Sequence, residues 1–204
     1  MTRPMTPAHD LTAQAAHLLL QVRAAERAAS PLQEKVLLLC ILDAAARAKY
    51  PREKERERVV RLLESCAAWD DRFKVSLEQL RAHLEVMFSE EERRASRLYR
   101  HVLERLAALR GMTASPQSDP SFVELEPLAL AEECQALGRA KYSSLLYAYR
   151  QEILAGFRMP ESEDQERSSM PEPYYRPADG SFHLVFPLAL MRRLVQSCIE
   201  TLTA

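Results

Sequence analysis

Glycine is scarce in this chain. Only four of its 204 residues are glycine, and no two of them lie close together: Gly111, Gly138, Gly156 and Gly180. A loop that cradles phosphate needs clustered glycines, so that backbone amides can approach the anion. The sequence therefore excludes P-loop and Rossmann dinucleotide sites, and it also lacks the G-x-S-x-G turn of serine hydrolases.

Cysteine is equally sparse and shows no pairing pattern. The four cysteines form no C-x-x-C pair and have no histidine at metal-ligand spacing: Cys40, Cys66, Cys134 and Cys198. Each lies in an apolar, helix-like stretch, which is typical of a buried free thiol rather than of a zinc ligand or a disulfide. We therefore expect no metal site and no cofactor.

Neither sign of charge is in excess. The chain has 28 Lys and Arg residues against 29 Asp and Glu residues, a net charge of -1. No overall field attracts nucleic acid, so any RNA contact must come from a local patch. In the run REKERER, residues 52–58, the signs alternate. At helical spacing this predicts ion pairs within a solvent-facing helix face rather than a basic stripe.

Long apolar runs are absent as well. The longest, Val36 to Leu42, is far too short to span a bilayer. The first residues, MTRPMTPAHD, lack the basic and apolar regions of a secretion signal. We therefore expect a cytoplasmic protein with no membrane partner.

Helix-forming patterns are abundant. Apolar residues recur with the i, i+3, i+4 spacing of a helix along most of the chain. A serine followed three residues later by Gln or Glu marks helix starts at Ser30, Ser76 and Ser89. The first of these helices contains the apolar run and is expected to be central and buried. The helix that begins after Ser89 is expected to reach about Arg110.

A hairpin signal lies near the C-terminus. Pro173 to Tyr175 and Ser181 to Phe186 flank a turn sequence at residues 177–180. The segments without a periodic pattern are expected to be flexible or to form loops: residues 1–7, 111–121 and 159–172. The prediction is an all-α fold, a single helical-bundle domain over residues 1–204 with about seven helices and a small β-hairpin before the last one.

One arginine lies in an otherwise apolar and aromatic helical stretch. Residues 141–158, KYSSLLYAYRQEILAGFR, place Arg150 in the middle of this helix. A buried arginine needs an anionic or carbonyl partner. Asp43, which directly follows the apolar run, is the candidate partner. Such a pair would give Arg150 a structural role.

Three segments resemble a prokaryotic branch of the HEPN (higher eukaryotes and prokaryotes nucleotide-binding) helical domains. In order they are ILDAAARAKYPREKERERVVRLL, YSSLLYAYRQEILAGFR and PEPYYRPADGSFHLVFPLALMRRLVQSCIETL. In that branch a buried helix ends in an aspartate before a K-Y-P-like turn, matched here by Asp43 and by residues 49–51. A later helix carries an arginine and a histidine, and a Tyr-Tyr hairpin and a terminal helix follow.

The resemblance implies a chemistry and also a defect in it. In HEPN ribonucleases the arginine neutralises the scissile phosphate, the histidine handles a proton as the RNA 2'-hydroxyl attacks, and a homodimer brings two such pairs together. Arg150 matches the arginine, whereas Ala155, Gly156 and Phe157 stand where the histidine is expected. None of these three can transfer a proton, so the resemblance implies a degenerate domain.

Two further sets of residues are candidate sites. Arg94 and His101 are seven positions apart, which on one helix places them on nearly the same face. Arg94 is also typical of a surface arginine in a charge-rich run. Aromatic and arginine residues of the last third of the chain offer base stacking and phosphate contacts, although a core with snorkelling arginines is the favoured explanation for them: Tyr149, Arg150, Arg158, Tyr174, Tyr175 and Arg176.

Three functional hypotheses follow. The first is a non-catalytic HEPN-like binding or regulatory module, a homodimer that acts on RNA, a nucleotide or a protein partner. The second is a metal-independent HEPN-type endoribonuclease that uses Arg150 or the Arg94 and His101 pair. The third is a helical protein-interaction scaffold with no nucleic-acid role.

Overall fold

The fold is described by a computed structural model, which covers residues 8–109, 116–156, 170–178 and 181–203. These residues are mostly helical, with one two-stranded antiparallel hairpin, as the sequence predicts. The helices are α1 (Ala8–Ala25), α2 (Pro31–Lys49), α3 (Glu55–Glu64), α4 (Leu77–Met87), α5 (Glu90–Ala95), α6 (Arg97–Ala108), α7 (Phe122–Leu125), α8 (Cys134–Arg139), α9 (Tyr142–Gly156) and α10 (Leu188–Glu200). The strands are β1 (Tyr174–Ala178) and β2 (Ser181–Val185). The described residues thus contain more helices than the expected seven, because some stretches expected to form one long helix form two or more short helices.

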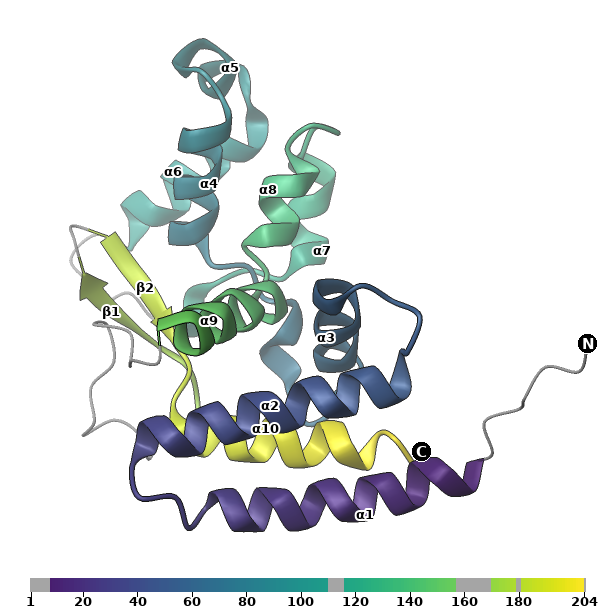
Figure 1. Ribbon diagram of the computed structural model, residues 1–204. Coiled ribbons are helices and arrows are strands. Elements are labelled where there is room, and N and C mark those ends of the chain that lie inside the picture. Colours follow the sequence, from purple (N-terminus) through teal and green to yellow (C-terminus); the bar gives the residue numbers. More distant parts are fainter. Residues whose placement is uncertain (1–7, 110–115, 157–169, 179–180, 204) are drawn as a thin grey trace, which may run out of the picture.

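A first hydrophobic core lies among α1, α2, α3, α9, α10 and the hairpin. In Figure 1, α1, α2 and α10 run side by side along the base of the molecule, with α3 and α9 above them. The apolar run of α2 supplies Leu38, Leu39 and Leu42 to this core. Leu37 of the same run is 45% exposed. The predicted burial therefore holds for the core-facing side of α2, whereas another side of the helix reaches the surface.

The only tryptophan of the chain belongs to this first core. Trp69 is buried, and its ring meets that of Phe186 edge-on, with the centroids 6.3 Å apart and the planes at 84°. Phe186 follows β2 directly and precedes α10, so this contact joins the segment after α3 to the C-terminal elements.

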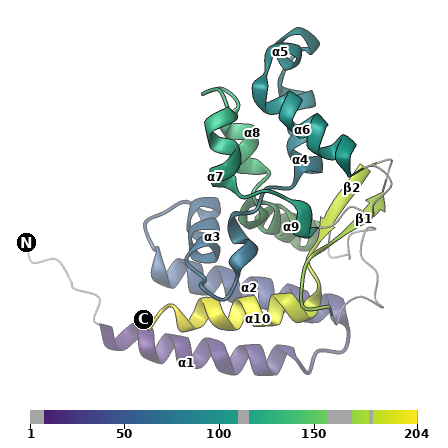
Figure 2. The same ribbon diagram turned by 180° about the vertical axis from the view of Figure 1, so that it is seen from behind.

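A second, smaller core lies among α4, α6, α7 and α8. These helices form the other end of the molecule, as seen from the front in Figure 1 and from behind in Figure 2. Leu80 and Leu84 of α4 are fully enclosed by Leu98 and Val102 of α6 and by Leu137 of α8 and its neighbours.

A buried polar cluster connects the two cores. The Asp119 carboxylate accepts hydrogen bonds from the Tyr142 hydroxyl of α9 at 2.7 Å, from the Tyr175 hydroxyl of β1 and from the Leu77 backbone N–H at 3.3 Å. The Ser76 Oγ lies 2.7 Å from the Tyr175 hydroxyl oxygen. Burial raises the pKa of Asp119 to about 6, although the hydrogen bonds from both tyrosines act in the opposite direction.

The helix predicted from Ser89 to about Arg110 is in fact two helices. Ser89 caps α5 with a capping box that includes Glu92, as the sequence predicts. The chain then leaves the helical conformation at Ser96, whose side chain accepts from the Tyr99 N–H at 2.9 Å and caps α6. The expectation of one continuous helix is therefore wrong.

The cysteines divide into two classes. Cys66 and Cys198 are buried free thiols of the first core, as predicted. Cys40 and Cys134 are free but exposed, so the prediction of burial is wrong for these two. The helical pattern of a sequence does not show which side of a helix is left uncovered by the neighbouring elements of the fold.

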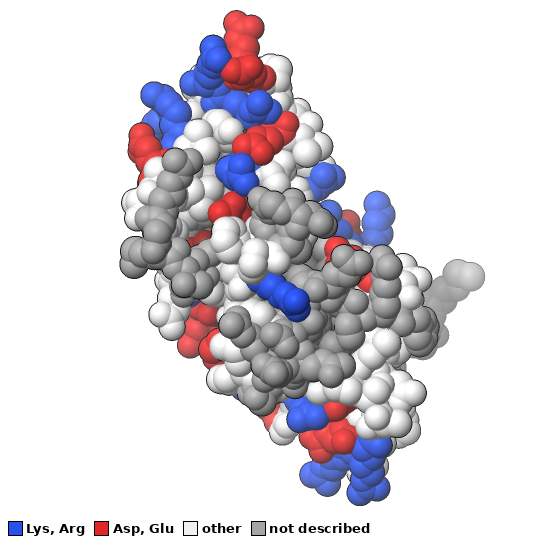
Figure 3. Space-filling model, turned by 90° about the vertical axis from the view of Figure 1, so that its left-hand side faces the viewer, with Lys and Arg blue, Asp and Glu red and all other residues white. Residues whose placement is uncertain are grey.

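Charge is mixed over the visible surface. On the face that carries the hairpin, basic and acidic side chains are interspersed at both ends, and the described part of this face has no continuous basic stripe (Figure 3). Among the helices that the structure describes, none combines the length and the apolar character needed to cross a bilayer.

Candidate functional site

Arg150 of α9 is held by acidic side chains of the same chain. Its Nη1 lies 2.6 Å from Glu55 Oε1 of α3, and its Nη2 lies 3.8 Å from Asp43 Oδ1 of α2. Its guanidinium carbon is 5.7 Å from the centre of the Tyr147 ring. Only 8% of the Arg150 side chain is exposed. The expected partner, Asp43, is present, but Glu55 is the closer one.

Asp43 is the centre of a wider ion-pair group. Arg58 Nη2 of α3 donates to Asp43 Oδ1 at 3.1 Å, and Arg47 Nη2 of α2 donates to Oδ2 at 3.2 Å. We call Asp43, Arg47, Glu55, Arg58 and Arg150 the Asp43 centre. It fastens α3 to α2 and to α9, because each helix supplies at least one charge to it.

The alternating run at residues 52–58 is mostly exposed to solvent, as expected, but its charges pair differently from the expectation. Its charges were expected to pair with one another along a solvent-facing side of one helix. Instead, Glu55 pairs with α9 and Arg58 with α2. Sequence spacing cannot identify these partners, since they are distant in the chain and meet only after α3 has docked.

The Asp43 centre leaves Arg150 unsuited to hold the phosphate of a substrate. Its guanidinium is engaged by carboxylates, and its Nε is buried with no acceptor among the described residues. The following residues of α9 include no histidine. On α9 this enclosed arginine thus has no histidine beside it that could transfer a proton.

Arg94 and His101 are not arranged as a pair on one helix. Arg94 belongs to α5 and forms an ion pair with Glu90, with 78% of its side chain exposed. His101 belongs to α6, beyond the break at Ser96. The common helix face expected for these two residues does not exist, because the chain changes direction between them.

The predicted aromatic groove is largely part of the core. Tyr149, Tyr174 and Tyr175 are all buried, so their ring faces are not open to bases. The Tyr149 hydroxyl accepts from the buried Lys35 amine at 2.6 Å. Arg176 is half-buried on β1. Arg158 lies outside the described residues.

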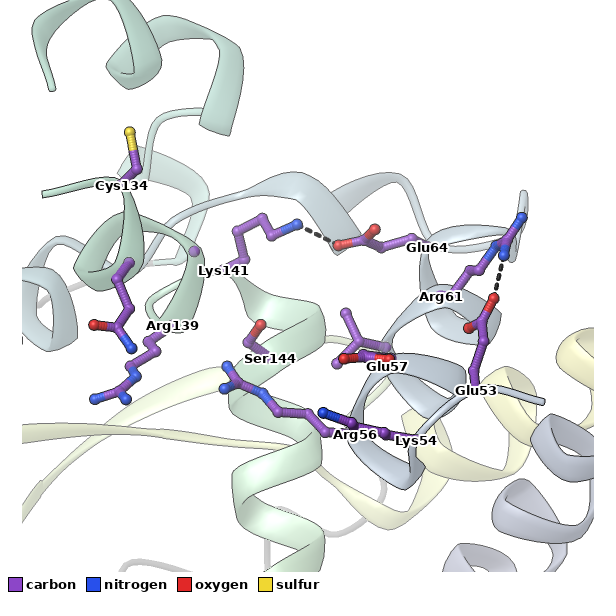
Figure 4. Close-up of a pocket in the computed structure, with 13 residues that line it drawn as sticks. Glu53, Lys54, Arg56, Glu57, Arg61, Glu64, Cys134, Arg139, Lys141 and Ser144 are labelled. Atoms are coloured by element: carbon purple, nitrogen blue, oxygen red, sulfur yellow. Dashed lines mark hydrogen bonds and ion pairs between the residues drawn. The ribbon is translucent and has the colours of Figure 1, made fainter. Parts of the chain in front are cut away.

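A cleft that the sequence did not indicate lies between α3 and α8. It has a volume of about 930 Å³, and it is also lined by Lys141, directly before α9, and by Ser144 of α9. Figure 4 shows Arg56 extending from α3 toward Arg139, which lies across the gap at the end of α8. The sequence does not indicate this site, because Arg56 lies in the alternating run and no pattern pairs that run with α8.

The charges of this cleft are only partly compensated. Five cationic side chains and three acidic ones line it. Two ion pairs lie within it, Arg61 with Glu53 and Lys141 with Glu64 (Figure 4). Among the described residues, no hydrogen bond or ion pair involves the side chains of the other cations: Lys54, Arg56 and Arg139.

The two arginines also act on a neighbouring histidine. The pKa of His83 on α4 is lowered, first by burial and then by repulsion from Arg139 and Arg56. Both guanidinium charges are therefore close enough to influence one imidazole. Among the residues that the structure describes, no group of His, Cys, Asp and Glu side chains is arranged to hold a metal ion.

Comparison of the chain with protein-family models, with curated proteins and with solved structures found no match.

Proposed function

We propose that this protein is a HEPN-like binding module that acts on RNA without cutting it. The observation that carries the proposal is the enclosure of Arg150. Its guanidinium is occupied by Glu55 at 2.6 Å and by Asp43 at 3.8 Å, in a side chain that is almost fully buried. The residue that matches the catalytic arginine of HEPN ribonucleases thus stabilises the fold instead of contacting substrate.

The choice of RNA rests on the resemblance to HEPN domains, since the chain has no overall positive charge. The predicted homodimer belongs to the same proposal and has the same support. The cytoplasmic location is also proposed, and it rests on the shortness of the apolar runs. In this proposal the domain retains its helical scaffold and surface, while the loss of the histidine removes the proton transfer that cleavage requires.

The test measures binding and cleavage in the same samples. Purified protein is incubated with fluorescent single-stranded RNAs in EDTA, and anisotropy and gel electrophoresis are recorded in parallel. We expect RNA binding that weakens with added salt, because phosphate contacts release counterions. We expect intact RNA at the end of the incubation.

The variants Arg94→Ala and His101→Ala test the ribonuclease alternative. RNA cleavage that either substitution abolishes would overturn the proposal. Absence of RNA binding at low salt would also overturn it and would favour the protein scaffold. Light scattering gives the mass, and a monomer at all concentrations would remove the homodimer from the proposal.

A further inference from the structure

We propose that the cleft between α3 and α8 is a phosphate-binding site, in which Arg56 and Arg139 hold the anion from opposite walls and Lys54 adds a third positive charge. This inference rests on the proposed function and places its ligand away from the Asp43 centre. The chemistry that the cleft recognises is a phosphate group, whether it belongs to an RNA backbone or to a free nucleotide.

Two arginines of the cleft lie across its gap from each other. Arg56 and Arg139 belong to different helices, and among the described residues no carboxylate forms an ion pair with either of them. Like charges at one end of a cleft repel one another, and an anion between them relieves this repulsion. Guanidinium groups also match phosphate oxygens geometrically, because their planar N–H donors bind in pairs.

Most of the acidic side chains of the cleft are already paired with cations. Glu53 and Glu64 are already occupied by Arg61 and Lys141. Glu57 is then the single acid of the lining without such a cation. In Figure 4 Arg56 and Arg139 point into the gap away from the two ion pairs, and Glu57 lies near Arg56 and Lys54. An incoming anion therefore meets a local excess of positive charge, although the whole chain is close to neutral.

The two helices that form the walls of the cleft, α3 and α8, are held in place by contacts within the protein. The Asp43 centre holds α3, and the second core holds α8 through Ala136 and Leu137. Lys141 spans the cleft to Glu64 and thereby connects α9 to α3. A site on elements that are already positioned loses less entropy on binding than one on loose segments.

The size of the cleft agrees with this class of ligand. Its volume of about 930 Å³ accommodates a nucleotide or a short stretch of RNA. Gln135 and Ser144 supply neutral hydrogen-bond donors on the same lining. Such donors contact phosphate or ribose oxygens without adding charge.

The experiment compares three probes on the full chain. Tripolyphosphate, ATP and a single-stranded RNA of about 12 nucleotides are titrated into the protein by calorimetry or anisotropy. We expect the double variant Arg56→Gln/Arg139→Gln to bind each probe that the wild type binds at least about tenfold more weakly, since it loses two charge-assisted contacts. The salt dependence of RNA binding should decrease as well.

The matched control is Arg23→Gln/Arg97→Gln. It removes the same net charge from exposed positions on α1 and α6, which lie outside the cleft. We expect it to bind the probes as the wild type does. Circular dichroism and thermal melting of both double variants show whether each is folded, so that a binding loss cannot be confused with unfolding.

A second readout is the His83 imidazole, followed by NMR and identified with His83→Gln. A phosphate bound between Arg56 and Arg139 offsets the two charges that lower the His83 pKa, so this pKa should rise when tripolyphosphate binds. Binding with no change at His83 would place the anion elsewhere and overturn the inference.

The outcomes separate the two proposals. RNA binding that is equal in wild type and in the Arg56→Gln/Arg139→Gln variant overturns the cleft assignment and leaves RNA binding standing. Binding of tripolyphosphate or ATP that needs both arginines, without any RNA binding, supports the phosphate site and overturns the RNA function. If the wild type binds none of the three probes, both proposals fail.

Discussion

At the scale of single residues, Arg150 shows how a charge inside a core is retained. Most of its side chain is excluded from water, and Glu55 and Asp43 compensate its charge. Glu55 is 47% exposed and keeps part of its hydration. In the ion pair of Arg150 with Glu55, only the arginine is strongly desolvated, and the carboxylate stays partly hydrated.

Replacement of Arg150 should destabilise the protein to an extent that depends on the new side chain. We expect Arg150→Ala to lower the free energy of unfolding by about 3 kcal/mol, because it removes both the buried packing and a charge that Asp43 needs. Arg150→Met keeps an apolar chain of similar length and should cost less. Urea denaturation gives these differences.

Arg94→Ala is the comparison, because its ion pair with Glu90 is exposed. It should leave the midpoint of unfolding almost unchanged. A destabilisation by Arg150→Ala that is no larger than that of Arg94→Ala would contradict a structural role for Arg150.

The sequence predicted two of the five residues of the Asp43 centre, Arg150 and Asp43. A lone arginine in an apolar helix requires an acid, and Asp43 was identified on that basis. Glu55 and Arg58 were not identified, because alternating charges at helical spacing look self-sufficient. The cleft was missed for a similar reason: the approach of Arg56 to Arg139 depends on how α3 and α8 are placed in space.

At the scale of elements, helix starts were predicted well and helix breaks were not. Ser30, Ser76 and Ser89 cap helices as expected, and the hairpin pairs Tyr174 with Val185 and Tyr175 with Leu184 in the predicted region. These features are local, since a cap needs only the next three residues. The break at Ser96 was missed because Tyr99 stands at the position where a capping box has Glu or Gln, although the Ser96 side chain does cap α6.

The cap at Ser96 should contribute measurably to stability. Ser96 is buried, and without its Oγ the Tyr99 N–H at the start of α6 loses its acceptor. We expect Ser96→Ala to lower the free energy of unfolding by about 1 kcal/mol in urea denaturation.

Ser89→Ala provides the contrast. It removes a similar cap from α5, which has no buried residues. The loss should appear as faster amide hydrogen exchange in α5 with little change in global stability. An equal global effect of the two substitutions would contradict the view that α6, and not α5, is anchored in the second core.

At the scale of the whole molecule, the two cores depend on the buried cluster around Asp119. Burial raises the pKa of this carboxyl from 3.8 to about 6, so the folded protein holds the proton more tightly than the unfolded chain does. Its stabilising contribution is therefore present below about pH 4 and is lost as the pH rises through 6.

Substitution by asparagine should remove this pH dependence. Asp119→Asn has no charge at any of these pH values, so its stability relative to wild type should improve between pH 4 and pH 7 by up to about 3 kcal/mol. Urea denaturation at both pH values measures the difference. A constant difference between the two proteins would show that Asp119 does not titrate in this range.

Trp69, which is in edge-on contact with Phe186, is an intrinsic fluorescence probe of the first core. Because the chain has one indole, all tryptophan emission comes from a single place in the first core. Trp69 does not line the cleft between α3 and α8. Loss of tertiary structure should thus shift the emission to longer wavelength, whereas phosphate in the cleft should leave it unchanged, and unfolding can be distinguished from ligand binding in one sample.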